Sequence, residues 1–234
     1  MNNKTLQVED YKNGQVILID KPLEWTSFQV VNKVRWLLKK SFDIKKIKVG
    51  HAGTLDPLAT GLLILCSGKF TKKIETFQAQ EKEYTGTFTL GATTPSYDLE
   101  TEIDQTFDTS EISSEEILTT TKQFTGEIQQ QPPVFSALKK EGKRLYEYAR
   151  KGEEVEIPFR TVTISEFVIT KIDLPKVEFR VVCSKGTYIR SLANDFGKAL
   201  NNGAHLSALR RTKIGDFSVA NAVDIETFEA SLRS

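Results

Sequence analysis

The sequence predicts an α+β fold built around a large mixed sheet, and three observations support this expectation. Residues 82–90 alternate apolar and polar side chains with a period of two, as in a half-buried strand. Residues 155–172 and 177–183 are strand-like segments joined by a short turn, which indicates an antiparallel pair. The helical patterns are separated from these hairpin-like strands, and this mixture is typical of an α+β fold.

The first elements can be placed from the N-terminal third of the chain. Val16–Asp20 is an apolar run that predicts a strand, and a turn over residues 21–26 leads to Ser27 as the expected helix N-cap. Apolar side chains then recur at helical spacing with basic side chains between them, which predicts an amphipathic helix. The apolar positions are Val30, Val31, Val34, Leu37 and Leu38. Short strands are expected at Ile47–Val49 and Leu62–Cys66.

The elements after residue 100 are predicted from helix-capping residues and from the proline and glycine residues that end helices and strands. Ser113 and Glu116 have the spacing of a capping box, which predicts a surface helix after them. Residues 129–133 are expected to form a loop, because paired prolines fix φ and remove amide donors. A short basic helix is expected at residues 144–150, and a longer one from Gly186 to about Leu200, where Asn-Asn-Gly ends it.

Length and composition describe a soluble globular protein. The chain has 234 residues, of which 39% are hydrophobic and 27% charged, enough for one large domain with a sizeable core. The longest apolar runs are strand-sized, and the first residues are polar, so we expect a cytoplasmic protein without a membrane span. Cys66 and Cys183 lie in apolar runs and are expected to be buried, reduced thiols.

Charge is distributed unevenly, although the net charge is only +1. Residues 31–50 hold seven Lys or Arg against one acid, residues 139–151 six against two, and residues 185–213 six against one. Residues 98–117 hold eight acids and no Lys or Arg. The basic stretches fit either a surface that follows RNA phosphates or ordinary solvated helix faces, and charge alone leaves both open.

Asp56 stands out as a carboxylate placed on a loop between two expected strands. Pro57 biases Asp56 toward extended geometry, and Gly53 and Gly61 permit sharp turns on either side. Loops on a rigid scaffold often carry catalytic groups, but an Asp before Pro is also an ordinary turn. Local geometry therefore does not distinguish a catalytic Asp56 from a structural one.

Six segments together resemble one family. They are Ile19–Pro22 with Thr26–Ser27, KVGHAGTLDPLATGLLIL (48–65), KEYTGTFTLGATTPSYDLE (82–100), QQQPPVFSALKKEGKRLYEYARKGEEVEI (129–157), CSKGTYIRSLANDFGKAL (183–200) and HLSALRRTKIGDFS (205–218). In this order, and from about residue 15 to about residue 225, the chain is similar to the TruB family of tRNA pseudouridine synthases. A match of this length is far more specific than any single short motif.

The resemblance implies the pseudouridine synthase fold, with a mixed, mostly antiparallel sheet, flanking helices and a central RNA-binding cleft. It also implies isomerisation of uridine 55 in the T-loop of tRNA, with Asp56 as the nucleophile that attacks a flipped-out nucleoside. Whether the attack falls on the base or the ribose stays open. Arg190 matches the arginine that pairs with this aspartate, and a guanidinium suits that role because it binds carboxylates in a bidentate manner.

The resemblance assigns further residues to the pocket for the flipped base. Tyr84 matches the tyrosine that stacks on the base, and Tyr188 and Leu209 match its apolar wall. His51 matches the histidine that fills the place that the base vacates, which would offset part of the cost of flipping. Lys21 with Pro22 matches a motif for which we expect a supporting role.

The resemblance also sets expectations for domains and partners. We expect a single catalytic domain over residues 1–234, because the C-terminal PUA domain of many bacterial members has no counterpart in this sequence. The expected partner is tRNA through its T stem-loop, with basic residues in 33–48, 139–151 and 210–213 as backbone contacts. We expect a monomer with no obligate protein partner, no cofactor and no metal; the chain has only two histidines and no CxxC motif.

A nucleotide-binding loop and an RNA-folding protein are the two alternatives to a pseudouridine synthase. Residues 61–69 do not form a nucleotide-binding P-loop, because six residues separate the glycines where the motif has four, and Phe70 stands where a Ser or Thr should follow the lysine. An RNA-binding or tRNA-folding protein with catalysis as a secondary activity is the stronger alternative. The joint presence of Asp56, Tyr84 and Arg190 favours the enzyme, since a protein without catalysis could lose any of them.

Overall fold

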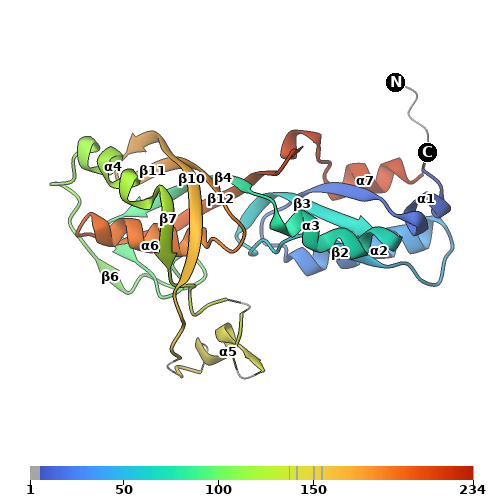
Figure 1. The fold of residues 1–234 in the computed structure, drawn as a ribbon, viewed down its shortest axis with the longest axis horizontal. Helices are drawn as coiled ribbons and strands as arrows, with labels where there is room; N and C mark the ends of the chain where they lie inside the picture. The colour runs from blue at the N-terminus through green and yellow to red at the C-terminus, as the bar shows by residue number, and fades with distance from the viewer. Residues whose placement is uncertain (1–5, 137, 141, 150, 154, 234) are drawn as a thin grey trace. The chain divides into compact units, whose positions relative to one another are not determined.

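A computed structural model describes residues 6–136, 138–140, 142–149, 151–153 and 155–233. The chain divides into two units (Figure 1): a first unit that combines Met1–Tyr84 with Arg210–Ser234, and a second unit of Thr85–Leu209. The expectation of a single catalytic domain stays a prediction. Within the described residues, no helix is long and apolar enough to cross a membrane.

The first unit is built on antiparallel strands. β1 (Val16–Lys21) and β2 (Val49–His51) both pair with β3 (Ala59–Ser67). Ile17 lies opposite Leu65 in this register. Side chains alternate along a strand, and here both faces carry apolar side chains, so both faces must be covered.

Helices and short turns provide that cover. One face packs against three helices, which are α1 (Val8–Asn13), α2 (Ser27–Ser41) and α7 (Ile225–Ser231). The opposite face packs against shorter elements, which are η1 (Gly68–Lys73), α3 (Ile74–Ala79), β13 (Phe217–Ser218) and η3 (Val219–Asn221). The sheet of the first unit is therefore enclosed on both sides.

The start of α2 differs by one residue from the expectation. Thr26, not Ser27, is the N-cap: its side chain accepts the Gln29 N–H, and the Gln29 side chain accepts the Thr26 N–H. The two bonds form a capping box. The prediction was wrong because the Ser27 hydroxyl bonds to Leu55, a contact that local sequence does not reveal. The amphipathic pattern is confirmed, since all five expected apolar positions of α2 are buried.

The second unit contains a sheet formed by β4 (Lys82–Leu90, from Thr85 on), β7 (Gly126–Gln130), β10 (Arg160–Asp173), β11 (Lys176–Cys183) and residues 204–209 of β12 (Ala204–Ile214). Its core is a group of aromatic rings. Phe88 stacks on Phe179 with ring centroids 4.1 Å apart, and Phe196 of α6 (Ile189–Ala199) packs against Phe88 and Phe167. Rings at these separations attract one another beyond the area that they bury, and these contacts fix α6 on the sheet.

Smaller elements complete the second unit. They are β5 (Ala92–Thr93) paired with β6 (Gln105–Thr106), α4 (Ser114–Thr120), η2 (Thr121–Phe124), β8 (Lys139–Lys140) paired with β9 (Lys143–Arg144), and α5 (Leu145–Ala149). The capping box of Ser113 and Glu116 at α4 is confirmed. Arg150, the expected end of the basic helix, lies outside the described residues.

β4 and β12 (Ala204–Ile214) contribute residues to both units. The nine-stranded sheet has the order β1-β3-β12-β4-β11-β10-β7, with β2 and β13 pairing beside this path. β1 with β3, β10 with β11, and β10 with β7 are antiparallel. The expected large sheet with flanking helices is confirmed.

Several expected boundaries were wrong: the strand expected at Ile47–Val49 is found at Val49–His51, and the helix expected from Gly186 begins at Ile189. Two further errors concern β7 and β10. Gln129 and Gln130 belong to β7 and not to a loop, because they pair with Thr161 and Arg160 of β10. β10 itself begins at Arg160, five residues later than the sequence suggested. Both errors have one cause, since the pairing partner decides where a strand begins and ends.

The two cysteines are buried thiols, as expected. Burial raises the pKa of Cys66 to about 11, so its thiol stays protonated at neutral pH.

Gly61 of β3 should not tolerate a larger side chain. Its φ is +103°, and an added Cβ would lie 2.3 Å from the Arg211 carbonyl oxygen. We expect Gly61→Ala to destabilise the protein by roughly 3 kcal/mol or more, as strain and overlap add. Gly126→Ala is the control, because its φ is +98° but nothing lies within 4 Å. Thermal unfolding measures both; equal losses would contradict the role of the Arg211 contact.

Candidate active site

Asp56 lies half-buried on the loop of residues 52–58, between β2 and β3, as the sequence predicted. Its carbonyl accepts a hydrogen bond from the Ala59 N–H at 3.1 Å, which begins the next strand. Three side chains of the first unit, from Lys21, Ser27 and Arg211, bond to the backbone of this loop. We call these three side chains the loop clamp.

Ser27 holds the residue just before Asp56. The Leu55 N–H donates to the Ser27 hydroxyl oxygen at 2.8 Å, and the same hydroxyl donates to the Leu55 carbonyl at 3.1 Å. One hydroxyl thus satisfies both backbone groups of a buried residue, using its donor and an acceptor lone pair. The first turn of α2 is thereby tied to the loop.

Lys21 holds the residue just after Asp56. Its ammonium is fully buried and donates to the carbonyls of Trp25 at 2.6 Å, Pro22 at 2.8 Å and Pro57 at 3.3 Å. The Glu24 N–H donates to the same Pro57 carbonyl at 2.8 Å. The expected supporting role of Lys21 with Pro22 is therefore consistent with its contacts.

Arg211 holds the loop from the opposite side. Its guanidinium is 1% exposed and donates from Nε to the Leu62 carbonyl at 2.8 Å, from Nη2 to Gly53 at 3.1 Å and from Nη1 to Thr54 at 3.4 Å. The donors of a guanidinium are spread over three nitrogens in one plane, so they reach carbonyls on separate segments that the single nitrogen of a lysine at this position would not span. Arg211 therefore joins β12, β3 and the loop.

The clamp includes a buried ammonium, that of Lys21, whose charge interacts with the Asp56 carboxylate. Burial lowers the pKa of Lys21 from 10.5 to about 8; attraction by Asp56 offsets part of this effect, and the charge of Arg211 adds to it. The Asp56 carboxylate thus lies within the electrostatic reach of Lys21. Polar groups fixed in a low-dielectric region act on a charge without reorganising, which is the arrangement that an active site requires.

His51 ends β2 beside the same loop. Its Nδ1 is buried and finds no hydrogen-bond partner among the described residues. Burial, and then the charge of Arg211, lowers the pKa of His51 below its ordinary value of 6.5. The imidazole is therefore neutral at physiological pH, which suits stacking on an apolar surface better than contact with an anion.

Tyr84 ends the first of the two chain segments that form the first unit, and its side chain is buried in β4. Phe88 and Leu90 are also buried, while the intervening threonines are more exposed, so the period-two pattern of the sequence is confirmed. Whether Tyr84 stacks on a base stays a prediction.

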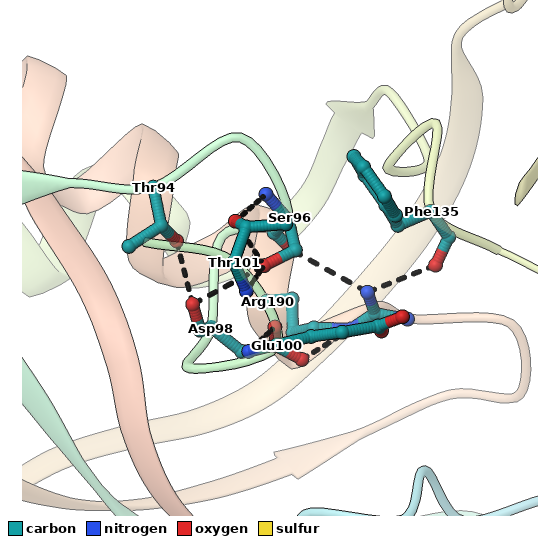
Figure 2. Close-up of polar contacts among 7 residues, drawn as sticks. All are labelled: Thr94, Ser96, Asp98, Glu100, Thr101, Phe135 and Arg190. Atoms are coloured by element: carbon teal, nitrogen blue, oxygen red, sulfur yellow. Dashed lines mark hydrogen bonds and ion pairs between the residues drawn. The ribbon is translucent and has the colours of Figure 1, made fainter. Parts of the chain in front are cut away.

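In the second unit, Arg190 is buried at the start of α6, where it meets a loop that the sequence did not single out (Figure 2). Its Nε lies 3.5 Å from Oδ2 of Asp98, and its Nη1 donates to the carbonyls of Phe135 at 2.9 Å and Ser96 at 3.3 Å. The Asp98 carboxylate also accepts the Glu100 N–H at 3.0 Å. This is a buried ion pair whose charges also have hydrogen-bond partners.

Tyr188 and Leu209 belong to the second unit as well. Tyr188 is the N-cap of α6, and Gln130 anchors its backbone twice: the Tyr188 N–H donates to Oε1 at 2.8 Å, and Nε2 donates to the Tyr188 carbonyl at 3.1 Å. Leu209 is half-buried on β12. Arg190, Tyr188 and Leu209 thus lie in one unit, and His51, Asp56 and Tyr84 in the other.

The sequence interpretation missed Asp98 and Arg211. Both lie inside segments that carry the family resemblance, and that membership was the available signal. Arg211 was counted as an RNA contact together with Arg210. Arg210 forms a bidentate pair with Asp20, at 2.6 and 3.0 Å, and its contact with RNA stays a prediction.

Among the residues that the structure describes, no group of three or more His, Cys, Asp or Glu could hold a metal ion.

Two protein-family models match the chain. A model described as "TruB family pseudouridylate synthase (N terminal domain)" matches residues 39–189, and one described as "tRNA pseudouridylate synthase B C-terminal domain" matches residues 190–234. The chain belongs to the TruB family of pseudouridylate synthases. The resemblance inferred from sequence segments is confirmed.

Curated relatives resemble this TruB-family chain along nearly its whole length. The tRNA pseudouridine synthase B of Flavobacterium johnsoniae is 67% identical over 226 residues, which cover 96% of this chain and 99% of the relative. The protein of the same name from Phocaeicola vulgatus is 55% identical, over 94% of this chain and 93% of the relative.

Two solved structures share the fold. The match titled "Structure of H/ACA RNP bound to a substrate RNA containing 2'-deoxyuridine" has a TM-score of 0.69 and 28% identity, covering 96% of this chain and 55% of that one. "Crystal Structure of a Cbf5-Nop10-Gar1 Complex" has a TM-score of 0.66 and 32% identity, covering 91% and 52%. The TruB-family chain spans about half the length of these solved chains.

Lys21→Met should change how stability depends on pH. Between pH 8 and 10.5 the unfolded chain keeps a proton on Lys21 that the folded chain has released. Wild-type stability should therefore rise with pH relative to Lys21→Met across this window, by on the order of 3 kcal/mol, and the difference should be constant below it. Urea unfolding at several pH values measures it. A difference that does not vary with pH would contradict the shifted pKa.

Arg211→Lys should impair catalysis more than Arg210→Lys. Lysine keeps the charge, but its single nitrogen would not replace the bonds that Nε, Nη1 and Nη2 of Arg211 make to Leu62, Thr54 and Gly53, so the Asp56 loop should shift. We expect kcat for pseudouridine formation to fall by about 10- to 100-fold, with a small change in KM. Arg210→Lys is the matched control, because Arg210 pairs with Asp20 and not with the loop. Equal kinetic effects of the two variants would refute the positioning role.

Proposed function

We propose that this protein is a tRNA pseudouridine synthase that isomerises uridine 55 in the T-loop, with Asp56 as the nucleophile. The observation that carries the proposal is the loop clamp, which holds the backbone on both sides of the half-buried Asp56, while the charge of the buried Lys21 attracts its carboxylate. The 67% identity to the Flavobacterium johnsoniae enzyme supports tRNA as the substrate. The fold-sharing structure with a bound substrate RNA supports an RNA substrate in general.

The reaction is an isomerisation that balances without an oxidant or reductant. The bond from uracil N1 to ribose C1′ breaks, the uracil turns, and a bond from C5 to C1′ forms, while C5 loses a proton and N1 gains one. A carboxylate nucleophile divides this rearrangement into easier steps through a covalent intermediate. The ionised form of Asp56 is the reactive one, and the positive charge of Lys21 attracts it.

The other residues fit supporting roles in this proposal. Tyr84 is a buried tyrosine that stacks on the flipped base, an interaction worth about 1–3 kcal/mol per base. Tyr188 and Leu209 complete the apolar wall of the base pocket, and His51 occupies the vacated position as a neutral ring. Pairing of Arg190 with Asp56 is part of the proposal, and the ion pair with Asp98 is suited to orient Arg190.

Asp56→Asn should abolish pseudouridine formation and retain tRNA binding. The amide cannot act as the nucleophile, whereas phosphate contacts on other residues are unaffected. Purified protein is incubated with unmodified tRNA transcript in EDTA, followed by pseudouridine mapping and a binding titration. Asp216→Asn is the control, because Asp216 is an exposed aspartate of the same unit.

The outcomes separate the enzyme from the RNA-folding alternative. Full activity of Asp56→Asn, or no pseudouridine at the T-loop position with the wild type, would overturn the proposal. A wild type that only refolds tRNA would support the alternative.

A further inference from the structure

The outer face of α2 carries a compact group of one aromatic and two basic side chains. The Trp36 ring has the Nζ atoms of Lys33 and Lys40 over it, each 4.8 Å from the ring centroid. These positions lie at i−3 and i+4 from the tryptophan, so all three share one helix face. We call Lys33, Trp36 and Lys40 the Trp36 cluster.

Packing of the fold does not explain the Trp36 cluster. The opposite face of α2 supplies the core contacts, while Trp36 is 49% exposed. Arg35 is different, because its guanidinium donates to Val49 and Asn32 and is part of the fold. Exposed aromatic rings flanked by cations are a feature of surfaces that bind nucleic acid.

The charged residues around the Trp36 cluster favour the binding of a polyanion. Lys39, Lys45, Lys46 and Lys48 are exposed in the same stretch, and Asp43 is its only acid. Glu229 of α7 is the acid that faces the cluster: it lies 3.7 Å from Lys33, its charge is also felt by Lys40, and it pairs with Arg233. Positive charge therefore exceeds negative charge on this face, and an RNA backbone complements it.

The cluster also lies within reach of an RNA held at Asp56. Ser27, the first residue of α2, bonds to Leu55, and Trp36 is nine residues further along the helix. At a rise of 1.5 Å per residue, this separation is about 14 Å along the helix axis. An RNA with its target nucleotide at the Asp56 loop can extend over this distance along α2.

We propose that the Trp36 cluster is a second RNA contact of this protein, in which Lys33 and Lys40 bind phosphates and the Trp36 ring stacks on a nucleotide outside the reacting position. This inference rests on the proposed function, since it takes tRNA as the bound RNA. It assigns binding, and not catalysis, to the cluster. Of the seven basic residues in 31–50, Lys33 and Lys40 are therefore the two proposed to bind phosphates beside the Trp36 ring.

Variants of the cluster test the proposal with unmodified tRNA transcript as the probe. Trp36→Ala should raise Kd and KM by about 10-fold, within the range for loss of one stacked base, and leave kcat at saturating tRNA unchanged. Lys40→Gln should reduce the slope of log Kd against log salt concentration by about 1, the value expected for the loss of one phosphate contact. Lys12→Gln is the control, because Lys12 is an exposed lysine of the first unit that pairs with Glu9.

Fluorescence gives a direct readout of stacking. The chain has two tryptophans, so Trp25→Phe leaves Trp36 as the single emitter. Titration with tRNA should quench its emission, and added salt should reverse the quenching. The proposal would be overturned if Trp36→Ala and Lys40→Gln both left the Kd for tRNA unchanged. It would also be overturned if saturating tRNA left the Trp36 emission unchanged. Wild-type activity tests the proposed function separately. If the wild type binds tRNA but forms no pseudouridine, the proposed enzyme activity is disproved and the Trp36 contact is not.

Discussion

Two buried cations, Lys21 and Arg211, hold the loop that carries Asp56, and much of the first unit is arranged around them. Each would be costly to bury alone, because removing an ion from water costs several kcal/mol. Backbone carbonyls on both sides of Asp56 accept their hydrogen bonds, and the Asp56 carboxylate attracts Lys21. The hydrogen bonds that compensate for burying Lys21 and Arg211 therefore also fix the backbone on both sides of Asp56. The stability of the first unit and the position of Asp56 depend on the same hydrogen bonds.

The second unit uses buried polar groups in a similar way. Arg190 is held by Asp98 and by two backbone carbonyls, and Gln130 binds both backbone groups of Tyr188. These groups lie at the start of α6, whose Phe196 is packed into the aromatic core. A helix anchored by packing at one point and by hydrogen bonds at its N-terminus presents its first residues in a defined geometry.

The basic residues of the chain divide into two kinds once their contacts are known. Arg35, Arg210 and Arg211 bond to carbonyls or a carboxylate of the protein itself, while Lys33 and Lys40 lie over an exposed ring. Arginine suits internal bridging because its planar fork reaches several acceptors. A count of charges along the chain cannot make this distinction, since it treats every cation alike.

The sequence by itself determined the α+β class, the strand at residues 82–90, the apolar face of α2 and the loop position of Asp56, because these follow from local periodicity and backbone preference. The resemblance of several segments identified the family. Only the tertiary structure decided that Ser27 bonds to Leu55 instead of capping α2, that Arg211 is a clamp, and that Asp98 pairs with Arg190. Each of these contacts joins residues far apart in the chain, and local pattern carries no information about which distant group satisfies a buried polar side chain.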